Sequence, residues 1–161
     1  MLSEQAARSL PYAPAALFDL AADLERYPQF LPGWISAQVY ARETDLCHAE
    51  QIVGFGPVRM RFRTTASLHR PEHIEIRSDD GRFSHFHLWW RFEPESARDC
   101  CVTLRVELEL RSRFLQSWLE RAAPGTAAQV LRAFEQRAAQ LLRPPARIAE
   151  SRDTAGSGND G

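Results

Sequence analysis

The residues best suited to chemistry in this sequence form two pairs, His85 with His87 and Asp19 with Asp23. The histidines alternate along a predicted strand and share one face, but no carboxylate or cysteine completes a metal-ligand spacing beside them. The aspartates lie one helical turn apart and are better explained as surface groups or a helix end. The sequence has no phosphate loop, dinucleotide fingerprint or nucleophile elbow. We therefore predict no catalytic residue and no metal site, and expect a protein that is not an enzyme.

A different chemistry, the burial of an apolar ligand, is suggested by the segment that runs from Tyr27 to Trp34. Its two prolines exclude a long helix and fix a short turn or helical hook. The segment carries four large apolar side chains, those of Tyr27, Phe30, Leu31 and Trp34. Two interpretations stay open: these side chains cap the core, or they line an opening into a mostly apolar pocket.

A third candidate chemistry is the binding of phosphate by arginine, because all 20 basic residues are Arg. Six arginines are expected on the polar face of successive strands and could contact the phosphates of RNA: Arg59, Arg61, Arg63, Arg77, Arg91 and Arg105. The alternative is a solvated face on which these arginines pair across strands with Glu75, Glu93, Glu107 and Glu109. The formal net charge of -1 favours the alternative.

Composition places the chain among ordinary globular proteins. Its 161 residues suffice for one domain, and the near-zero net charge gives no general attraction to DNA or membranes. Three cysteines make a poor disulfide framework, and we see neither a signal peptide nor an apolar run of the ~20 residues that span a bilayer. We expect a cytoplasmic protein, with peripheral contact at the inner membrane as a further option.

The periodicity of apolar residues predicts the elements that must position these side chains. Alternation predicts strands, and three- and four-residue steps predict helices. We expect strands at 4–11, 35–41, 47–55, 58–68, 74–76, 86–92 and 102–110, and helices at 15–24, 114–123 and 125–142. In the second strand Ile35, Ala37 and Val39 should share the apolar face. Pro124-Gly125 should break the chain between the last two helices.

Together these elements predict an α+β fold in which a curved, seven-stranded antiparallel sheet wraps around a long C-terminal helix. Short turns between successive strands favour an antiparallel meander, and the apolar stripe of the long helix must lie on the inner face of the sheet. The domain should span 1–143, and the Ser/Gly/Asp-rich residues 144–161 should form a disordered tail. A mostly apolar pocket between sheet and helix is the expected site.

The chain resembles the coenzyme Q-binding START-like family, part of the polyketide cyclase and Bet v 1-like helix-grip superfamily. The tyrosine-proline-x-phenylalanine-leucine-proline hook at Tyr27–Pro32 is the most specific match. The segments that carry the resemblance are 10–12, 17–18, 23–32, 53–55, 90–94, 110–116 and 133–137. The chain departs from the family pattern at Gly33-Trp34, where tryptophan often follows the second proline directly, and at Pro124-Gly125, where the family helix usually continues.

The resemblance implies a helix-grip fold whose cavity holds ubiquinone or another isoprenoid lipid, in a carrier or chaperone that supports respiration. Its bacterial branch implies an alternative, a ribosome-association toxin that binds the large ribosomal subunit and blocks subunit joining. A polyketide aromatase or cyclase is a third reading. The residues expected to bind the ligand, each of which could instead be ordinary core, are Tyr27, Phe30, Leu31, Pro32, Trp34, Phe55, Phe62, Phe86, Trp90, Phe92, Trp118, Leu131 and Phe134.

Overall fold

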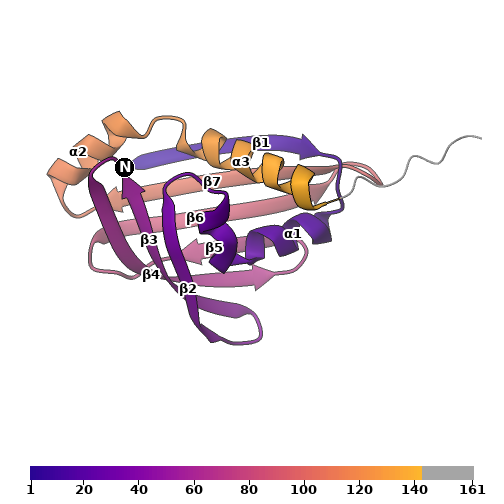
Figure 1. Ribbon diagram of the computed structural model, residues 1–161, viewed down its shortest axis with the longest axis horizontal. Coiled ribbons are helices and arrows are strands. Elements are labelled where there is room, and N and C mark those ends of the chain that lie inside the picture. Colours follow the sequence, from indigo (N-terminus) through magenta and orange to yellow (C-terminus); the bar gives the residue numbers. More distant parts are fainter. Residues whose placement is uncertain (143–161) are drawn as a thin grey trace, which may run out of the picture.

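The computed structural model describes residues 1–142, so the tail expected at 144–161 lies outside the described residues. Seven strands form one antiparallel sheet in the order β1-β7-β6-β5-β4-β3-β2 (Figure 1). Each strand after β2 pairs with the one before it, as expected for a meander, and β1 closes the sheet beside β7. The strands are β1 Leu2–Leu10, β2 Trp34–Arg42, β3 Leu46–Phe55, β4 Val58–His69, β5 His73–Arg77, β6 Phe83–Pro94 and β7 Cys100–Leu110.

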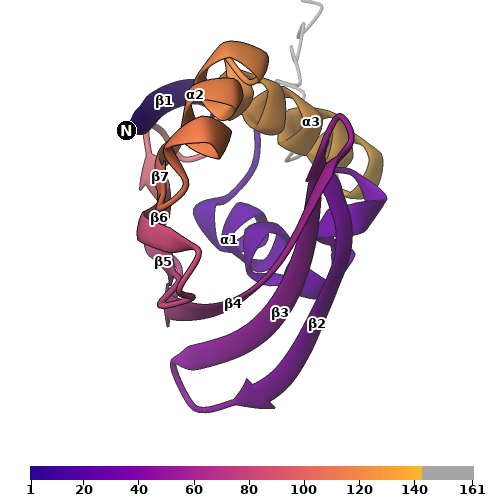
Figure 2. The same cartoon turned by 90° about the vertical axis from the view of Figure 1, so that its left-hand side faces the viewer.

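The helices lie on the concave side of this sheet, which curves so strongly that its two edges approach the same helix layer (Figure 2). They are α1 Pro14–Ala22, the short 3-10 helix η1 Leu24–Gln29, α2 Arg113–Ala122 and α3 Thr126–Leu141. The predicted α+β fold, with a curved seven-stranded antiparallel sheet and a C-terminal helix packed on it, is confirmed. In the part of the chain that the structure describes, no helix is both long and apolar enough to cross a membrane.

Side chains of α1 and α3 pack against the C-terminal half of β6. Phe134 of α3 is fully buried, and its ring centroid lies 4.8 Å from that of Trp90. Phe18 of α1 meets Phe92 edge to face at 5.9 Å. These contacts join helices from both ends of the chain to one strand, so packed side chains fill this end of the molecule. We call it the closed end.

The predicted break between the last two helices is present and marks the opposite, open end. Gly125 adopts φ 78°, a left-handed conformation that glycine adopts without strain, and it serves as the N-cap residue of α3. The Glu4 carboxylate accepts hydrogen bonds from the backbone N–H groups of Gly125 and Ala127 at 2.8 and 2.9 Å. A carboxylate at a helix N-terminus stabilises it by satisfying free N–H groups and opposing the helix dipole. The first strand thereby fixes where α3 begins.

One predicted strand face is wrong near the start of β2. The alternation placed Ile35 inward, but Ile35 is 43% exposed. The pairing of β2 with β3 shifts between Trp34 and Ser36, as at a β-bulge, so Trp34 and Ile35 depart from the alternation while Ala37 and Val39 keep the predicted inward face. The indole of Trp34 points inward instead, and this places it in the wall of the pocket described below.

Candidate functional site

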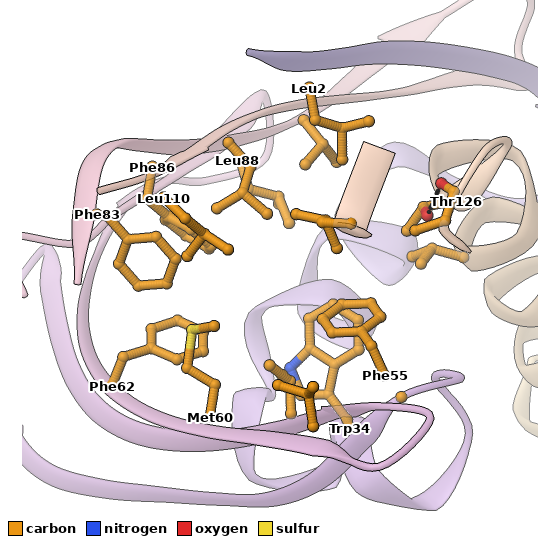
Figure 3. Close-up of a pocket in the computed structure, with 18 of the residues that line it drawn as sticks. Leu2, Trp34, Phe55, Met60, Phe62, Phe83, Phe86, Leu88, Leu110 and Thr126 are labelled. Atoms are coloured by element: carbon orange, nitrogen blue, oxygen red, sulfur yellow. Dashed lines mark hydrogen bonds between the residues drawn. The ribbon is translucent and has the colours of Figure 1, made fainter. Parts of the chain in front are cut away.

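An apolar pocket opens at the open end of the molecule, between the sheet and α2. Its volume is about 80 Å³, and its lining comes from every strand except β5, and from α2, α3 and the loop before β2. Figure 3 shows Trp34 and Phe55 on one side of the space, with Phe86, Leu88 and Leu110 on the other. Because segments distant in sequence meet here, the pocket is a property of the whole fold.

Three phenylalanines form the wall of the pocket on the sheet side. The ring centroid of Phe62 lies 5.1 Å from that of Phe83 and 5.3 Å from that of Phe86, and Phe83 and Phe86 are 5.2 Å apart. Such tilted and edge-to-face pairs are favourable arrangements of aromatic rings. The triangle holds this wall in place, so the pocket is bounded on this side by a rigid apolar surface.

Trp34, Phe55 and Trp118 line the pocket and are only partly buried, so they lie where it meets solvent, which we call its mouth. Gly56, in the turn between β3 and β4, has φ 58°, and a Cβ atom there would approach the Trp118 ring at 3.5 Å. Gly33, just before Trp34, has φ 85° and accepts a 2.8 Å hydrogen bond from the Gly54 backbone N–H. Both glycines therefore supply positive φ values that the turns at the mouth require, and Gly33 also lets the chain approach the Gly54 carbonyl closely.

A chain of polar groups runs behind this apolar lining. Trp34 Nε1 donates to Gln51 Oε1 at 2.6 Å, and Gln51 Nε2 donates to Thr64 Oγ1 at 2.9 Å. Gln51 and Thr64 are each 2% exposed, although they lie on the inner faces of β3 and β4 among apolar side chains. Burying polar groups is costly unless they are hydrogen-bonded, and each of these three side chains has at least one hydrogen-bond partner within the chain of groups.

Sequence reasoning missed this polar chain and several lining residues, among them Met60 and Phe83. A signal for Gln51 was available, because it occupies the inward register of β3 between Ala49 and Val53. A polar residue at an inward position requires a hydrogen-bond partner inside the protein. The partner could not be identified from sequence, since it is supplied by the displaced register of Trp34.

The residues expected to bind the ligand divide into two groups. One group lines the pocket: Pro32, Trp34, Phe55, Phe62, Phe86 and Trp118. The other lies outside the lining, packed within or against the core: Tyr27, Phe30, Leu31, Trp90, Phe92, Leu131 and Phe134. Tyr27 in η1 shows the reason, since its hydroxyl donates to the Ala21 carbonyl and its ring meets Phe30 and Trp34 edge to face. Most of the segment from Tyr27 to Trp34 thus packs between α1 and β2, and only its last residues reach the pocket.

The six arginines proposed as RNA contacts are on the outer face of the sheet, and within residues 1–142 all but Arg59 form ion pairs with glutamates. Arg61 and Arg63 both approach Glu50 on the neighbouring strand, at 3.7 and 3.8 Å. Along their own strands Arg77 pairs with Glu75 at 3.3 Å, Arg91 with Glu93 at 3.4 Å and Arg105 with Glu107 at 2.8 Å.

The expectation that these arginines pair across strands is therefore wrong for Arg77, Arg91 and Arg105. The strand register explains it, because His87 lies opposite Arg77 and Trp89 lies opposite Arg105, so no carboxylate stands across from them. The guanidinium of Arg105 instead lies over the Trp89 ring, 5.1 Å from its centroid. Among the described residues, Glu109 forms no ion pair with an arginine.

His87 is buried on this outer face rather than solvated, with only 8% of its side chain exposed. It lies beside Glu75 at 3.6 Å, and His85 lies beside Glu107 at 3.0 Å. Among the described residues, no group of three or more His, Cys, Asp and Glu side chains could hold a metal ion.

Acidification is expected to destabilise the fold through His87. Burial is the main cause that lowers the pKa of this imidazole, and Arg77 and His85 lower the pKa further, while Glu75 and Glu107 oppose them. Because the folded-state pKa is below the unfolded one, the unfolded chain binds the proton first as pH falls. The free energy of unfolding should therefore decline below about pH 6.5 and level off under the folded-state pKa. Urea unfolding between pH 8 and 5 measures this, and H87Q should reduce the decline; an identical decline in H87Q would contradict it.

Comparison with known proteins gives a consistent result. A model of the family described as polyketide cyclase/dehydrase and lipid transport matches residues 10–135. The ribosome association toxin RatA of Pseudomonas aeruginosa is 34% identical over 132 residues, which cover 82% of this chain and 92% of that protein. The mitochondrial coenzyme Q-binding protein COQ10 homolog B of Xenopus laevis is 26% identical over 82% of this chain and 56% of that protein. A START superfamily protein from Mycobacterium smegmatis has a TM-score of 0.74 at 16% identity, covering 86% of this chain and 98% of that one, which confirms the START-like fold.

Proposed function

Because the chain belongs to the polyketide cyclase/dehydrase and lipid transport family, and matches a ribosome association toxin over most of its length, we propose that it associates with the ribosome. The partner we propose is the large subunit, with interference in subunit joining as the effect. The observation that carries this proposal is the 34% identity over 82% of the chain with RatA of Pseudomonas aeruginosa.

The outer face of the sheet supports this proposal in spite of its ion pairs. The guanidinium groups of Arg61 and Arg63 lie 3.7 and 3.8 Å from the Glu50 carboxylate, and both side chains are well over half exposed. Exposed ion pairs of this kind contribute about 0–1 kcal/mol. Exchanging Glu50 for an RNA phosphate as the partner of these arginines therefore costs little free energy. A guanidinium can also donate two parallel hydrogen bonds to one phosphate.

Replacing Arg59, Arg61 and Arg63 together with glutamine is expected to weaken binding to large subunits and to flatten its dependence on salt. Each lost phosphate contact should reduce the slope of log affinity against log salt concentration by about one unit. Co-sedimentation with purified large and small subunits, between 50 and 300 mM KCl, measures both quantities.

A matched control removes the same charge from other exposed positions: Arg98, Arg121 and Arg132. This triple variant should keep the wild-type salt slope. Equal slopes in both triple variants would place the contact on another surface, and wild-type protein that fails to sediment with either subunit would refute ribosome association itself.

A second candidate function is supported by the geometry of the pocket: binding of an apolar lipid, with an isoprenoid quinone as the ligand we propose. Transfer of each CH₂ group out of water contributes about 0.8 kcal/mol, so a short chain already binds well. The described cavity of about 80 Å³ is smaller than the ~300–1,000 Å³ usual for ligand sites. A ligand must therefore widen the mouth, and Trp34, Phe55 and Trp118 are the side chains that would move.

We propose binding rather than catalysis for this pocket. Polar side-chain atoms on its described lining are confined to the Trp34 indole nitrogen and the Thr126 hydroxyl. Both are already engaged, since Thr126 Oγ1 donates to the Ala123 carbonyl at 2.6 Å and Trp34 donates to Gln51. Among the described lining residues no acid faces a base across the lumen, as general acid–base chemistry requires.

The test of lipid binding is native mass spectrometry of the protein isolated from its host, followed by solvent extraction of whatever it carries. We expect a mass increment that an extracted quinone or lipid accounts for. Protein of apo mass that also takes up no decylubiquinone in solution would refute this second function and leave ribosome association standing.

A further inference from the structure

The polar chain behind Trp34 has no evident role in closing the core. An apolar residue at position 51 would pack against Ala49 and Phe62 without needing partners, yet the inner face of the sheet carries an amide there. That amide contacts the pocket through one side chain, because Trp34 both lines the lumen and donates to Gln51 Oε1 at 2.6 Å. The arrangement brings hydrogen-bonding capacity to the edge of an otherwise apolar space.

Counting donors shows that this capacity is not used up. A glutamine amide nitrogen has two N–H groups. Gln51 Nε2 donates one to Thr64 Oγ1 at 2.9 Å, and among the described residues no acceptor takes the other. The Trp34 indole N–H is already matched by Gln51 Oε1 at 2.6 Å, so the second N–H of Gln51 is the donor left over. The site therefore has a hydrogen-bond donor without an acceptor, and a ligand group that complements it must be an acceptor.

From this surplus we propose that Gln51 and Trp34 form a subsite for a carbonyl oxygen of the bound lipid, which rests on the second function proposed above. The ligand's apolar body fills the space between the phenylalanine wall and α2. Its carbonyl oxygen accepts from the free N–H of Gln51, and from the Trp34 indole when that ring turns away from Gln51 Oε1. The ligand class is thus a lipid with a carbonyl group, as distinct from a hydrocarbon or a fatty chain alone.

The backbone beside Trp34 permits this movement. Pro32 and Gly33 precede it, and the φ of 85° at Gly33 belongs to a region that glycine leaves and enters without a Cβ penalty. The indole is only partly buried at the mouth, in contrast to the fully buried Trp90. A rotation of the Trp34 side chain both widens the lumen and exposes Gln51. The entry of the lipid and the recognition of its carbonyl oxygen therefore depend on the same side chain.

The experiment compares two ligands of equal chain length, decylubiquinone and decylbenzene, on wild-type protein and on Q51M. Methionine keeps the unbranched shape of glutamine and removes its amide. We expect Q51M to lose about tenfold in affinity for the quinone, the worth of a hydrogen bond, and to bind the hydrocarbon as wild type does. A purely structural role for Gln51 would change both affinities alike, and that result would overturn the subsite.

A second measurement uses wild-type protein and so does not depend on how well Q51M folds. The indole N–H resonance of Trp34, assigned by its loss in W34F, should shift on saturation with decylubiquinone and stay in place with decylbenzene. The same response to both ligands would overturn the subsite while leaving lipid binding intact. Wild-type protein that binds neither ligand would overturn lipid binding, and the subsite with it.

Discussion

Replacing Phe134 with alanine is expected to lower the free energy of unfolding by about 3–5 kcal/mol, a large part of the stability of a domain this size. Phe134 is fully buried in α3, and its ring meets Trp90 of β6 at a centroid distance of 4.8 Å. Alanine leaves a cavity that Trp90 cannot fill, because Trp90 is itself held parallel to Phe92 at 6.3 Å. The long helix would lose the aromatic contact that joins it to β6.

Urea unfolding followed by circular dichroism measures this loss. Phe114 of α2 offers a matched control, since it is 81% exposed and F114A should change stability by no more than about 0.5 kcal/mol. A loss below about 1 kcal/mol for F134A would mean that the closed end is not the packed core of the fold. Folded F134A should still bind an apolar ligand, because Phe134 lies outside the pocket lining.

The contrast between Phe86 and Trp90 shows how much of the site the sequence could predict. Alternation along β6 correctly places both on the apolar face, four residues apart. Phe86 lines the pocket, whereas Trp90 is packed against Phe134. A period-two pattern predicts which face of the sheet a side chain lies on. It does not predict which other element packs on that face at a given position of the strand. α3 covers Trp90, and its position is set by contacts distant in sequence.

The misplaced face at Ile35 has a similar origin. An unbroken alternation through β2 is what the sequence shows, but the strand slips against β3 between Trp34 and Ser36. The slip reverses Trp34 and Ile35 and leaves Ala37 and Val39 on the inner face, and only the pairing with β3 reveals it. The break at Pro124-Gly125 was predictable for the opposite reason, since proline and glycine impose their backbone limits locally.

Replacing Leu108 with tryptophan is expected to abolish lipid binding while the fold survives. Leu108 lies on β7 with 8% exposure and lines the pocket, opposite Phe86 on the neighbouring strand. An indole there would occupy much of the cavity of about 80 Å³. If it displaces four CH₂ groups of the ligand, the loss is about 3 kcal/mol, or roughly a hundredfold in affinity.

The stability of L108W separates a filled pocket from a damaged fold. Because the added ring enters existing space, the free energy of unfolding should fall by less than the ~1–3 kcal/mol typical of overpacking a solid core. L108M, which nearly conserves volume, should bind decylubiquinone as wild type does, by fluorescence titration. If L108W folds and binds the quinone with wild-type affinity, the ligand is not held in this pocket. Ribosome association should be unchanged in L108W, since Leu108 lies on the opposite face of the sheet from the arginines, and a parallel loss of both activities would instead indicate that the filled pocket alters the outer surface.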